Sequence, residues 1–492
     1  MKAAPIKVRQ NLCSGVPGKP VFMTAAIILC AVVLASGLRF YRIGDWSFTA
    51  DETATIAEHD SLFGAADESA DSQINRLPRL IPLAYIIPHL GYGILGRDEF
   101  GSRVPSALLG VLGVLLIFVT IVRTWGRPAA AAAVVLIALS PDHLFHSQEN
   151  RFYIAAWLFS SAAMLFGAVA ARQQSLSVMC VACGLAVAAT LVHTLQGLVS
   201  AGLVVAIILS GWARQRRTVT PLAILAMTST LIAGIIVAVQ VMRFGRGWNA
   251  GGGWGYGMLH SIMGAVLQIG WPNALLALLG AADVVATRDG EGVYWLTWAG
   301  VWAASTVVLP LMVVYHPAYT FPLTLGVFLL AGRAVGKVFE LIRIQSLATA
   351  CVWFGVACLL QAPDIASYYM DGSRYDYRSA AQWVSDNWQP GDRIAAVSPG
   401  LLSRYLKAPK PITGLRTTDP FLGDETEAGR EGRVWIVVPV GRTGLVPAMR
   451  KWLDAHCRRV GLIQQHRYDY YEYAVEIYLR PAGEDSAAKE IR

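Results

Sequence analysis

The chain is poor in charge. Only 15% of its 492 residues are Asp, Glu, Lys or Arg, whereas soluble domains carry about 25%. Apolar residues make up 55% of the chain. They recur in runs of about 18 residues or more, which is the length that crosses a bilayer core as a helix. The composition excludes a string of soluble domains and predicts a protein that spans a membrane many times.

Cysteine offers no disulfide framework, although the chain has seven. Five of them lie inside apolar runs, and Cys457 is alone in the C-terminal segment. Cys180 and Cys183 form a C-x-x-C within a hydrophobic run, without a neighbouring His or charge. We interpret them as small packing residues, which argues against a redox motif and a disulfide-stapled domain.

The apolar runs predict about eleven transmembrane helices, at 21–41, 104–122, 128–146, 152–171, 176–194, 196–212, 219–242, 264–286, 293–314, 318–335 and 346–363. With the N-terminus in the cytoplasm, every predicted inside loop carries Lys or Arg, as the positive-inside rule requires. The net charge of +8 is therefore assigned to membrane orientation, and no nucleic-acid partner is expected.

Two segments interrupt this pattern. The apolar segment 78–96 contains three prolines, and counting it as a span would place the later basic loops outside. We therefore expect interfacial helices in a long first outer loop, 42–103. The loop 244–257 is rich in Gly and Trp. It fits either an interfacial linker or a mobile flap over a lipid-linked substrate.

A change of composition after Pro363 predicts a second domain. Residues 372–481 alternate between helical and strand patterns, which favours a small doubly wound α/β sheet outside the cytoplasm, serving as a lid or docking domain. Residues 1–371 form the predicted transmembrane catalytic domain, and the charged tail 482–492 is expected to lack fixed structure.

Polar residues that do not act as anchors gather on one predicted face of the membrane. Ionisable groups near a membrane are expensive, so their positions indicate function. The Asp51-Glu52 pair lies in the first outer loop, Glu149 and Arg151 lie between the third and fourth spans, and His193 ends the fifth. A transporter or lipid flippase would place such groups near mid-membrane, often in two repeated halves. A non-catalytic scaffold is a further alternative.

Several motifs, in order, resemble those of the GT-C membrane glycosyltransferases, of the protein O-mannosyltransferase and lipid A aminoarabinose transferase type. They are the Asp51-Glu52 pair, the segment 81–90, the Arg103-x-Pro-Ser-Ala signature in 101–108, the Ser-Pro…Ser-Gln-Glu-x-Arg-x-Tyr signature in 140–153, the segment 316–322, and 376–392 at the start of the outer domain. The resemblance covers most of the chain. It departs from the family pattern at Leu80 and Ala318.

The resemblance implies a glycosyltransferase that moves a sugar from a polyprenyl-phosphate donor to an extracytoplasmic lipid, cell-wall glycan or protein. A single base that acts on the face opposite the leaving group makes the transfer inverting. An acceptor hydroxyl must lose its proton as it attacks, so one carboxylate base is required. We expect Asp51 to be that base and Glu52 to orient it or to bind the acceptor. The candidate substrate-binding residues are Arg79, Tyr85, His146, Gln148, Glu149, Arg151, Tyr153, His193, His316 and Tyr319.

No cluster has convincing metal-ligand spacing, so we assign no metal ligands and no cofactor. A divalent metal is possible but not required. The Ala- and Gly-rich composition favours a bacterial plasma membrane with the active site facing the periplasm. The expected partners are the bilayer, the lipid-linked donor and the acceptor.

Overall fold

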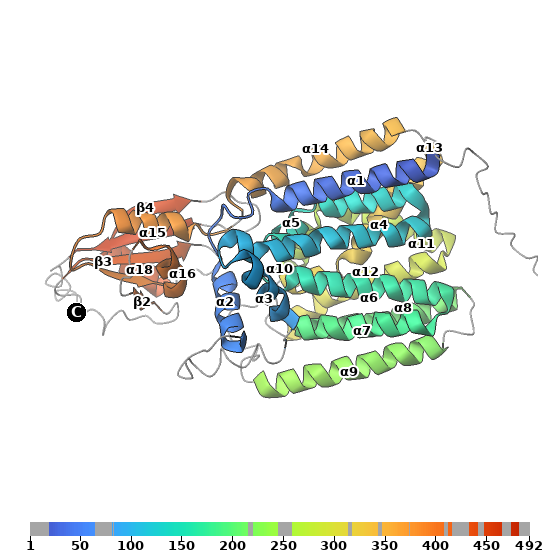
Figure 1. Ribbon diagram of the computed structural model, residues 1–492, viewed down its shortest axis with the longest axis horizontal. Coiled ribbons are helices and arrows are strands. Elements are labelled where there is room, and N and C mark those ends of the chain that lie inside the picture. The colour runs from blue at the N-terminus through green and yellow to red at the C-terminus, as the bar shows by residue number, and fades with distance from the viewer. Residues whose placement is uncertain are drawn as a thin grey trace, which may run out of the picture.

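The computed structural model describes residues 19–63, 81, 83–214, 220–244, 258–312, 317–342, 347–372, 374–407, 412–415, 432–440, 447–464 and 474–481. A bundle of long helices carries a small sheet domain at one end (Figure 1). We call this end of the bundle the sheet end. The expected tail 482–492 and most of the Gly-rich loop, 245–257, lie outside the described residues.

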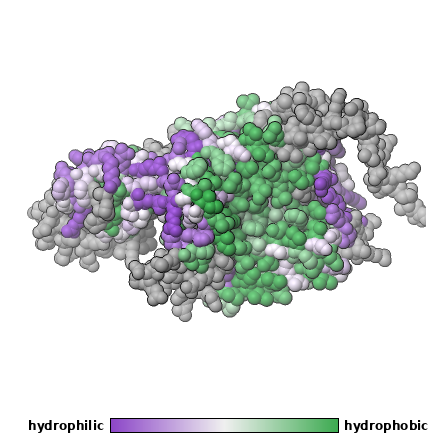
Figure 2. All heavy atoms as spheres, viewed as in Figure 1, coloured by the Kyte–Doolittle hydropathy of each residue, from purple (hydrophilic) through white to green (hydrophobic). Residues whose placement is uncertain are grey.

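The bundle is built from the apolar runs of the sequence. Figure 2 shows a hydrophobic belt on the visible face of the bundle, with hydrophilic residues towards both ends. Six of its helices, within the described residues, are long and apolar enough to cross a membrane, or seven if one bent pair counts as a span. The predicted count of about eleven is not confirmed. The bundle helices are α1 (Lys19–Phe40), α4 (Glu99–Ala138), α6 (Tyr153–Gln173), α7 (Leu176–Val192), α8 (Gly197–Ala213), α9 (Thr220–Phe244), α10 (Met258–Ile269), α11 (Trp271–Thr287), α12 (Gly290–Met312), α13 (Leu325–Ile342) and α14 (Leu347–Asp371).

Helix α4 contains two of the predicted spans, 104–122 and 128–146, joined at Gly126. The positive φ of Gly126, 80°, is a conformation that glycine adopts without a Cβ penalty. Arg103, near the start of the first leg, and Ala138, at the end of the second, both contact the chain at the sheet end through Glu52 and Arg39. The two legs therefore run in opposite directions. The second ends eight residues before the predicted boundary, because Ser140 and Pro141 begin the separate helix α5 (Pro141–Ser147).

Two other predicted spans differ from the structure. The range 264–286 is not one straight helix, because α10 and α11 meet at an angle of 88°. The range 318–335 begins with two short 3-10 turns, η2 (Pro317–Tyr319) and η3 (Phe321–Leu323), and only then enters α13. Pro317 and Pro322 lie at or next to the starts of these turns, where proline is tolerated better than in a helix interior.

Two short helices run across the bundle axis at the sheet end (Figure 1). They are α2 (Ala50–Phe63) and α3 (Leu83–Leu95). With 13 residues, α3 is about 20 Å long and cannot cross a hydrocarbon core of about 30 Å. This agrees with the prediction that 78–96 is not a span.

The sheet domain has five strands in the order β2-β1-β3-β5-β4. Strands β2, β1 and β3 are parallel, whereas β5 and β4 join antiparallel. The sheet is therefore mixed, and only its first half fits the doubly wound prediction. No pattern in the sequence predicted α16 or β2. The elements are α15 (Tyr377–Asp386), β1 (Arg393–Ala396), α16 (Pro399–Tyr405), β2 (Ile412–Gly414), β3 (Val434–Val440), α18 (Pro447–His456), β4 (Arg458–Gln464) and β5 (Ala474–Arg480).

The sheet domain packs directly on the segment that leads into α2. Phe48 and Ile56 share a hydrophobic cluster with Tyr377 and Leu402 of the domain. The Tyr405 hydroxyl accepts a hydrogen bond from the Phe48 amide at 2.6 Å and donates one to Glu99 at 2.6 Å. Apolar packing and partly buried hydrogen bonds thus fix the domain against the chain around Asp51.

Candidate active site

The start of α2 determines which way its two acids point. Thr49 and Glu52 form a capping box, in which the Glu52 amide donates to Thr49 Oγ1 at 3.1 Å and the Thr49 amide donates to Glu52 Oε2 at 2.9 Å. This pairing turns Glu52 into the protein, where its side chain is fully buried. Asp51, one residue earlier, is exposed.

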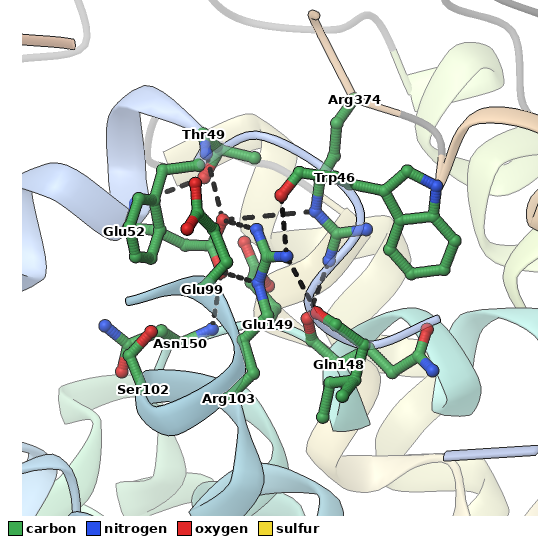
Figure 3. A network of polar contacts seen from close by, with 12 residues as sticks. Trp46, Thr49, Glu52, Glu99, Ser102, Arg103, Gln148, Glu149, Asn150 and Arg374 are labelled. Carbon is green, nitrogen blue, oxygen red and sulfur yellow. Dashed lines mark hydrogen bonds and ion pairs between the residues drawn. The ribbon is translucent and has the colours of Figure 1, made fainter. Parts of the chain in front are cut away.

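Glu52 is the centre of a buried ion-pair network (Figure 3). Arg103 Nε donates to Glu52 Oε1 and Arg103 Nη2 to Oε2, both at 2.8 Å, and the Asn150 amide donates to Oε1 at 2.8 Å. Arg374 Nε lies 3.9 Å from Oε2. Burial alone would raise the pKa of Glu52, but the charge and hydrogen bonds of Arg103 outweigh it and lower the pKa from 4.5 to about 2. Glu52 is therefore ionised, and both of its carboxylate oxygens already accept hydrogen bonds from the protein.

Arg151 joins the loop between α5 and α6 to the Asp51 turn of α2. Its Nη1 donates to the Asp51 carbonyl oxygen at 3.1 Å and to Thr55 Oγ1 at 2.7 Å. Glu58 follows on the same helix face, because residues three and four apart are neighbours. Burial would lower the pKa of Arg151, but the nearby charges of Asp51, Glu149 and Glu58 contribute to raising it. The guanidinium thus lies within an acidic group of side chains.

A second group of predicted residues lies around the entry of α6. His146 Nδ1 is 3.1 Å from Glu149 Oε2, and its ring centroid is 4.8 Å from that of Tyr153. His193, after the end of α7, lies 5.6 Å from Tyr319 and 6.2 Å from Tyr153 between ring centroids. The structure therefore brings these five residues together from three separate segments of the chain.

Gln148 does not fit the expectation that it binds substrate. Its side chain is fully buried. The amide nitrogen lies 3.0–3.1 Å from the carbonyl oxygens of Leu38, Arg39 and Tyr41, and the Tyr368 hydroxyl donates to its oxygen at 2.5 Å. Both ends of the amide are occupied, so Gln148 fixes the C-terminus of α1 instead.

Three further predicted residues have different outcomes. Tyr85 is 1% exposed, and its hydroxyl donates to Glu58 Oε2 at 2.7 Å. Tyr85 therefore holds Glu58 within the acidic side chains around Arg151 and does not line an open surface. Arg79 and His316 lie outside the described residues.

Sequence reasoning missed four residues of this region. Arg103 and Asn150 lie inside the quoted 101–108 and 140–153 signatures, so a signal was present. Glu58 stands seven residues after Asp51, a helical spacing that brings both to one face. Arg374 has no sequence signal, because its contacts with the chain around Glu52 and Gln148 are more than 200 residues away.

The described residues contain no group of three or more His, Cys, Asp or Glu side chains that could hold a metal ion. The carboxylates in this part of the chain instead face Arg103, Arg151 and His146.

The central segment of the chain is similar to a known protein family. Residues 78–239 match the family model described as dolichyl-phosphate-mannose-protein mannosyltransferase. This segment includes the Arg103 signature, the 140–153 signature and His193. Comparison with curated protein sequences finds no match.

Solved structures extend the similarity to nearly the whole chain. ArnT from Cupriavidus metallidurans, bound to undecaprenyl phosphate, matches with a TM-score of 0.51 and 15% identity over 94% of this chain and 98% of that chain. The oligosaccharyltransferase of Archaeoglobus fulgidus in the apo form matches with a TM-score of 0.52 and 12% identity over 84% of this chain and 69% of that chain. At such identities the structures show a shared fold. Residues 78–239 are thus similar to a family of lipid-linked sugar transferases, and the described chain shares its overall fold with these two solved membrane transferases, as the motifs predict.

Proposed function

We propose that this protein is an inverting glycosyltransferase that moves a sugar from a polyprenyl-phosphate donor to an extracytoplasmic acceptor, with Asp51 as the general base. The observation that carries the proposal is the geometry of the α2 start. The capping box buries Glu52 and leaves Asp51 exposed, next to Arg151. An exposed carboxylate on a fixed helix turn beside a cation suits proton abstraction from an acceptor hydroxyl.

The reaction needs one base and a place for developing phosphate charge. As the acceptor oxygen forms its bond to the anomeric carbon, its proton passes to Asp51. The bond from that carbon to the phosphate oxygen breaks, and the phosphate keeps the electron pair. Attack from the face opposite the leaving group inverts the anomeric centre, as in inverting glycoside chemistry.

Arg151 and His193 are the described residues best suited to the leaving phosphate. Arg151 Nε and His193 Nδ1 are buried and have no hydrogen-bond partner within the described parts of the chain, so they remain available to a substrate oxygen. Guanidinium offers a planar fork that matches phosphate. Arg79 and His316 complete the proposed phosphate contacts, and Tyr153 and Tyr319 are proposed to line the sugar.

Three other residues act through their neighbours, and a fourth, Glu58, is proposed to contact the acceptor. Glu52 is fully buried and paired, so we assign it to orienting the Asp51 turn and not to binding the acceptor. His146 and Glu149 are hydrogen-bonded to each other and hold the segment that carries Arg151. Glu58, supported by Tyr85, is proposed to accept a hydrogen bond from the acceptor.

The proposed orientation places the sheet end outside the cytoplasm. At the opposite end, Arg172 and Arg214 flank Glu291 at 3.8 Å, and Arg333 pairs with Asp283 and Asp289. Basic residues concentrate in cytoplasmic loops. The site then faces the periplasm of a bacterial plasma membrane, and its position next to the hydrophobic belt suits a donor whose lipid remains in the bilayer (Figure 2).

The proposal is tested by transfer from defined donors. Purified protein in proteoliposomes receives polyprenyl phosphates that carry different radiolabelled sugars, together with lipid, glycan and protein fractions of the outer membrane face. We expect one donor to label one class of acceptor, with inversion at the anomeric carbon. Transport of the intact donor across the bilayer without transfer would instead indicate a flippase.

Replacing Arg151 by Gln is expected to lower kcat by about 10²–10³, because one donor to the leaving phosphate is lost. Arg151→Lys keeps the charge but not the fork, so it should recover only part of that loss. Single-turnover transfer rates measure both variants. Arg97→Gln is the matched control, since Arg97 lies at the same end and pairs with partly exposed Asp60. An Arg151→Gln rate equal to that of the control would remove Arg151 from the site.

A further inference from the structure

Arg374 lies where the membrane part of the chain passes into the sheet domain, between α14 and α15. It is 1% exposed, although long charged side chains are almost never fully buried unless they are paired. The proposed chemistry does not use it. Its surroundings explain why it is buried, and they connect the two segments that carry the proposed base and the proposed phosphate contacts.

On one side, Arg374 contacts the segment that leads to Asp51. Its guanidinium carbon lies 5.4 Å from the centre of the Trp46 ring, and its Nε is 3.9 Å from Glu52 Oε2. Figure 3 shows the guanidinium between Trp46 and Glu52. The neighbouring Gly372, with φ of 67°, packs so closely on Trp46 that a Cβ there would lie 2.4 Å from the ring. Its carbonyl accepts a hydrogen bond from Arg374 Nη1 at 2.6 Å.

On the other side, Arg374 contacts the segment that leads to Arg151. The centre of the Phe145 ring lies 4.8 Å from its guanidinium carbon. Arg374 Nη2 donates to the Gln148 carbonyl at 2.9 Å. Gln148 comes directly before Glu149, Asn150 and Arg151. The Arg374 guanidinium therefore contacts an aromatic ring of each segment. It also forms an ion pair with the first segment and a hydrogen bond with the second.

The charge of Arg374 has a counter-charge in the same network. Glu52 already accepts two hydrogen bonds from Arg103, so its carboxylate is shared by two guanidinium groups. Burial would lower the pKa of Arg374, but Tyr368 and Glu52 outweigh it and raise the pKa. Arg374 is thus a fixed cation, and no shorter side chain or ammonium group reproduces both its stacking and its hydrogen bonds.

We propose that Arg374 is a positioning residue for sugar transfer, which sets the spacing between the Asp51 turn and the Arg151 loop and makes the sheet domain part of the catalytic framework. A lid would need to separate from the bundle during turnover, whereas the contacts of Arg374 tie the entry of the domain to both segments. This inference rests on the proposed function, because it assumes that Asp51 and Arg151 act on the same substrate.

The test compares Arg374→Ala with Arg433→Ala in the full-length protein. Arg433 is the matched control, because it is an arginine of the sheet domain that forms an ion pair with Asp392 at 2.7 Å and contacts neither segment in the hydrogen bonds and ion pairs of the described residues. We expect Arg374→Ala to lower kcat about 100-fold, since misplacing reacting groups by about 1 Å costs that much. KM for the donor should change little. Guanidinium at millimolar concentration should restore part of kcat in Arg374→Ala and leave Arg433→Ala unchanged.

A purely structural role would lower the folded fraction of Arg374→Ala without changing the kcat of the folded protein, and guanidinium would not restore activity. That result overturns the proposal. If the Ala variant does not fold, the same kcat and KM measurements are made on Arg374→Lys. A kcat of Arg374→Lys equal to that of the parent then contradicts the proposal. Asp51→Asn is measured beside them. Full activity of Asp51→Asn would remove the proposed base, whereas a loss confined to Asp51→Asn would remove only the role of Arg374.

Discussion

Replacing Asp51 by Asn is expected to slow sugar transfer by a factor of about 10²–10⁴, which is the range that a positioned general base contributes. The amide cannot take the acceptor proton, but it has nearly the same size and leaves the helix turn intact. The capping box depends on Thr49 and Glu52, so the fold should not change. Single-turnover kinetics with a saturating labelled donor measure the effect on the chemical step.

Two comparisons separate loss of the base from general damage. Binding of the donor to Asp51→Asn should match the parent, since the contacts proposed for phosphate come from Arg151 and His193. Asp60→Asn is the matched control, because Asp60 lies on the same helix, is partly exposed and pairs with Arg97. An Asp51→Asn variant as active as Asp60→Asn would remove Asp51 from the reaction.

Replacing Glu52 by Gln is expected to destabilise the protein by about 3–5 kcal/mol, because breaking a buried ion pair leaves an uncompensated charge. Here the loss would leave both Arg103 and Arg374 buried beside a neutral amide. The thermal midpoint in detergent micelles measures the change. The control is Glu340→Gln, which breaks an exposed pair with Lys337 and should cost no more than about 1 kcal/mol. Equal midpoints for the two variants would contradict the account.

The same carboxylate gives stability a predictable dependence on pH. The folded pKa of Glu52, about 2, is lower than its ordinary value of 4.5. A carboxyl group whose pKa is lowered by folding contributes its full stabilisation at pH values above its ordinary pKa. It loses this stabilisation as the pH falls towards its folded pKa. The parent should therefore lose this contribution between about pH 4.5 and pH 2, and Glu52→Gln should lack it.

The membrane part of the fold could be predicted because apolar length and loop charge are local properties of the sequence. The errors occur where a single residue changes the chain direction. The second leg of α4 ends at Ala138, eight residues before the predicted boundary, because Pro141 begins the separate helix α5. The 88° bend before Trp271 turns a predicted straight span into a pair of helices. Such breaks depend on backbone angles and on contacts with neighbouring helices. The hydrophobic periodicity of the sequence carries no information on either.

The candidate site was predicted in part for a similar reason. The motif positions identified Asp51, Glu149 and Arg151, but not which side chains are buried. Gln148 was assigned to substrate because it stands within a polar motif, yet its partners are carbonyls at the end of α1, more than 100 residues earlier. The opposite orientations of Asp51 and Glu52 follow from the Thr49 capping box, which is a local pattern and could have been recognised.

The most direct measurement of the role of Asp51 uses a nucleophile that needs no base. Asp51→Gly should fail to glycosylate the natural acceptor, but in the presence of azide it should form a glycosyl azide, because azide attacks without losing a proton. The account predicts that this product has the anomeric configuration opposite to that of the donor. If Asp51→Gly binds the donor but forms no glycosyl azide, or forms one with the donor configuration, Asp51 is not the base of an inverting transfer.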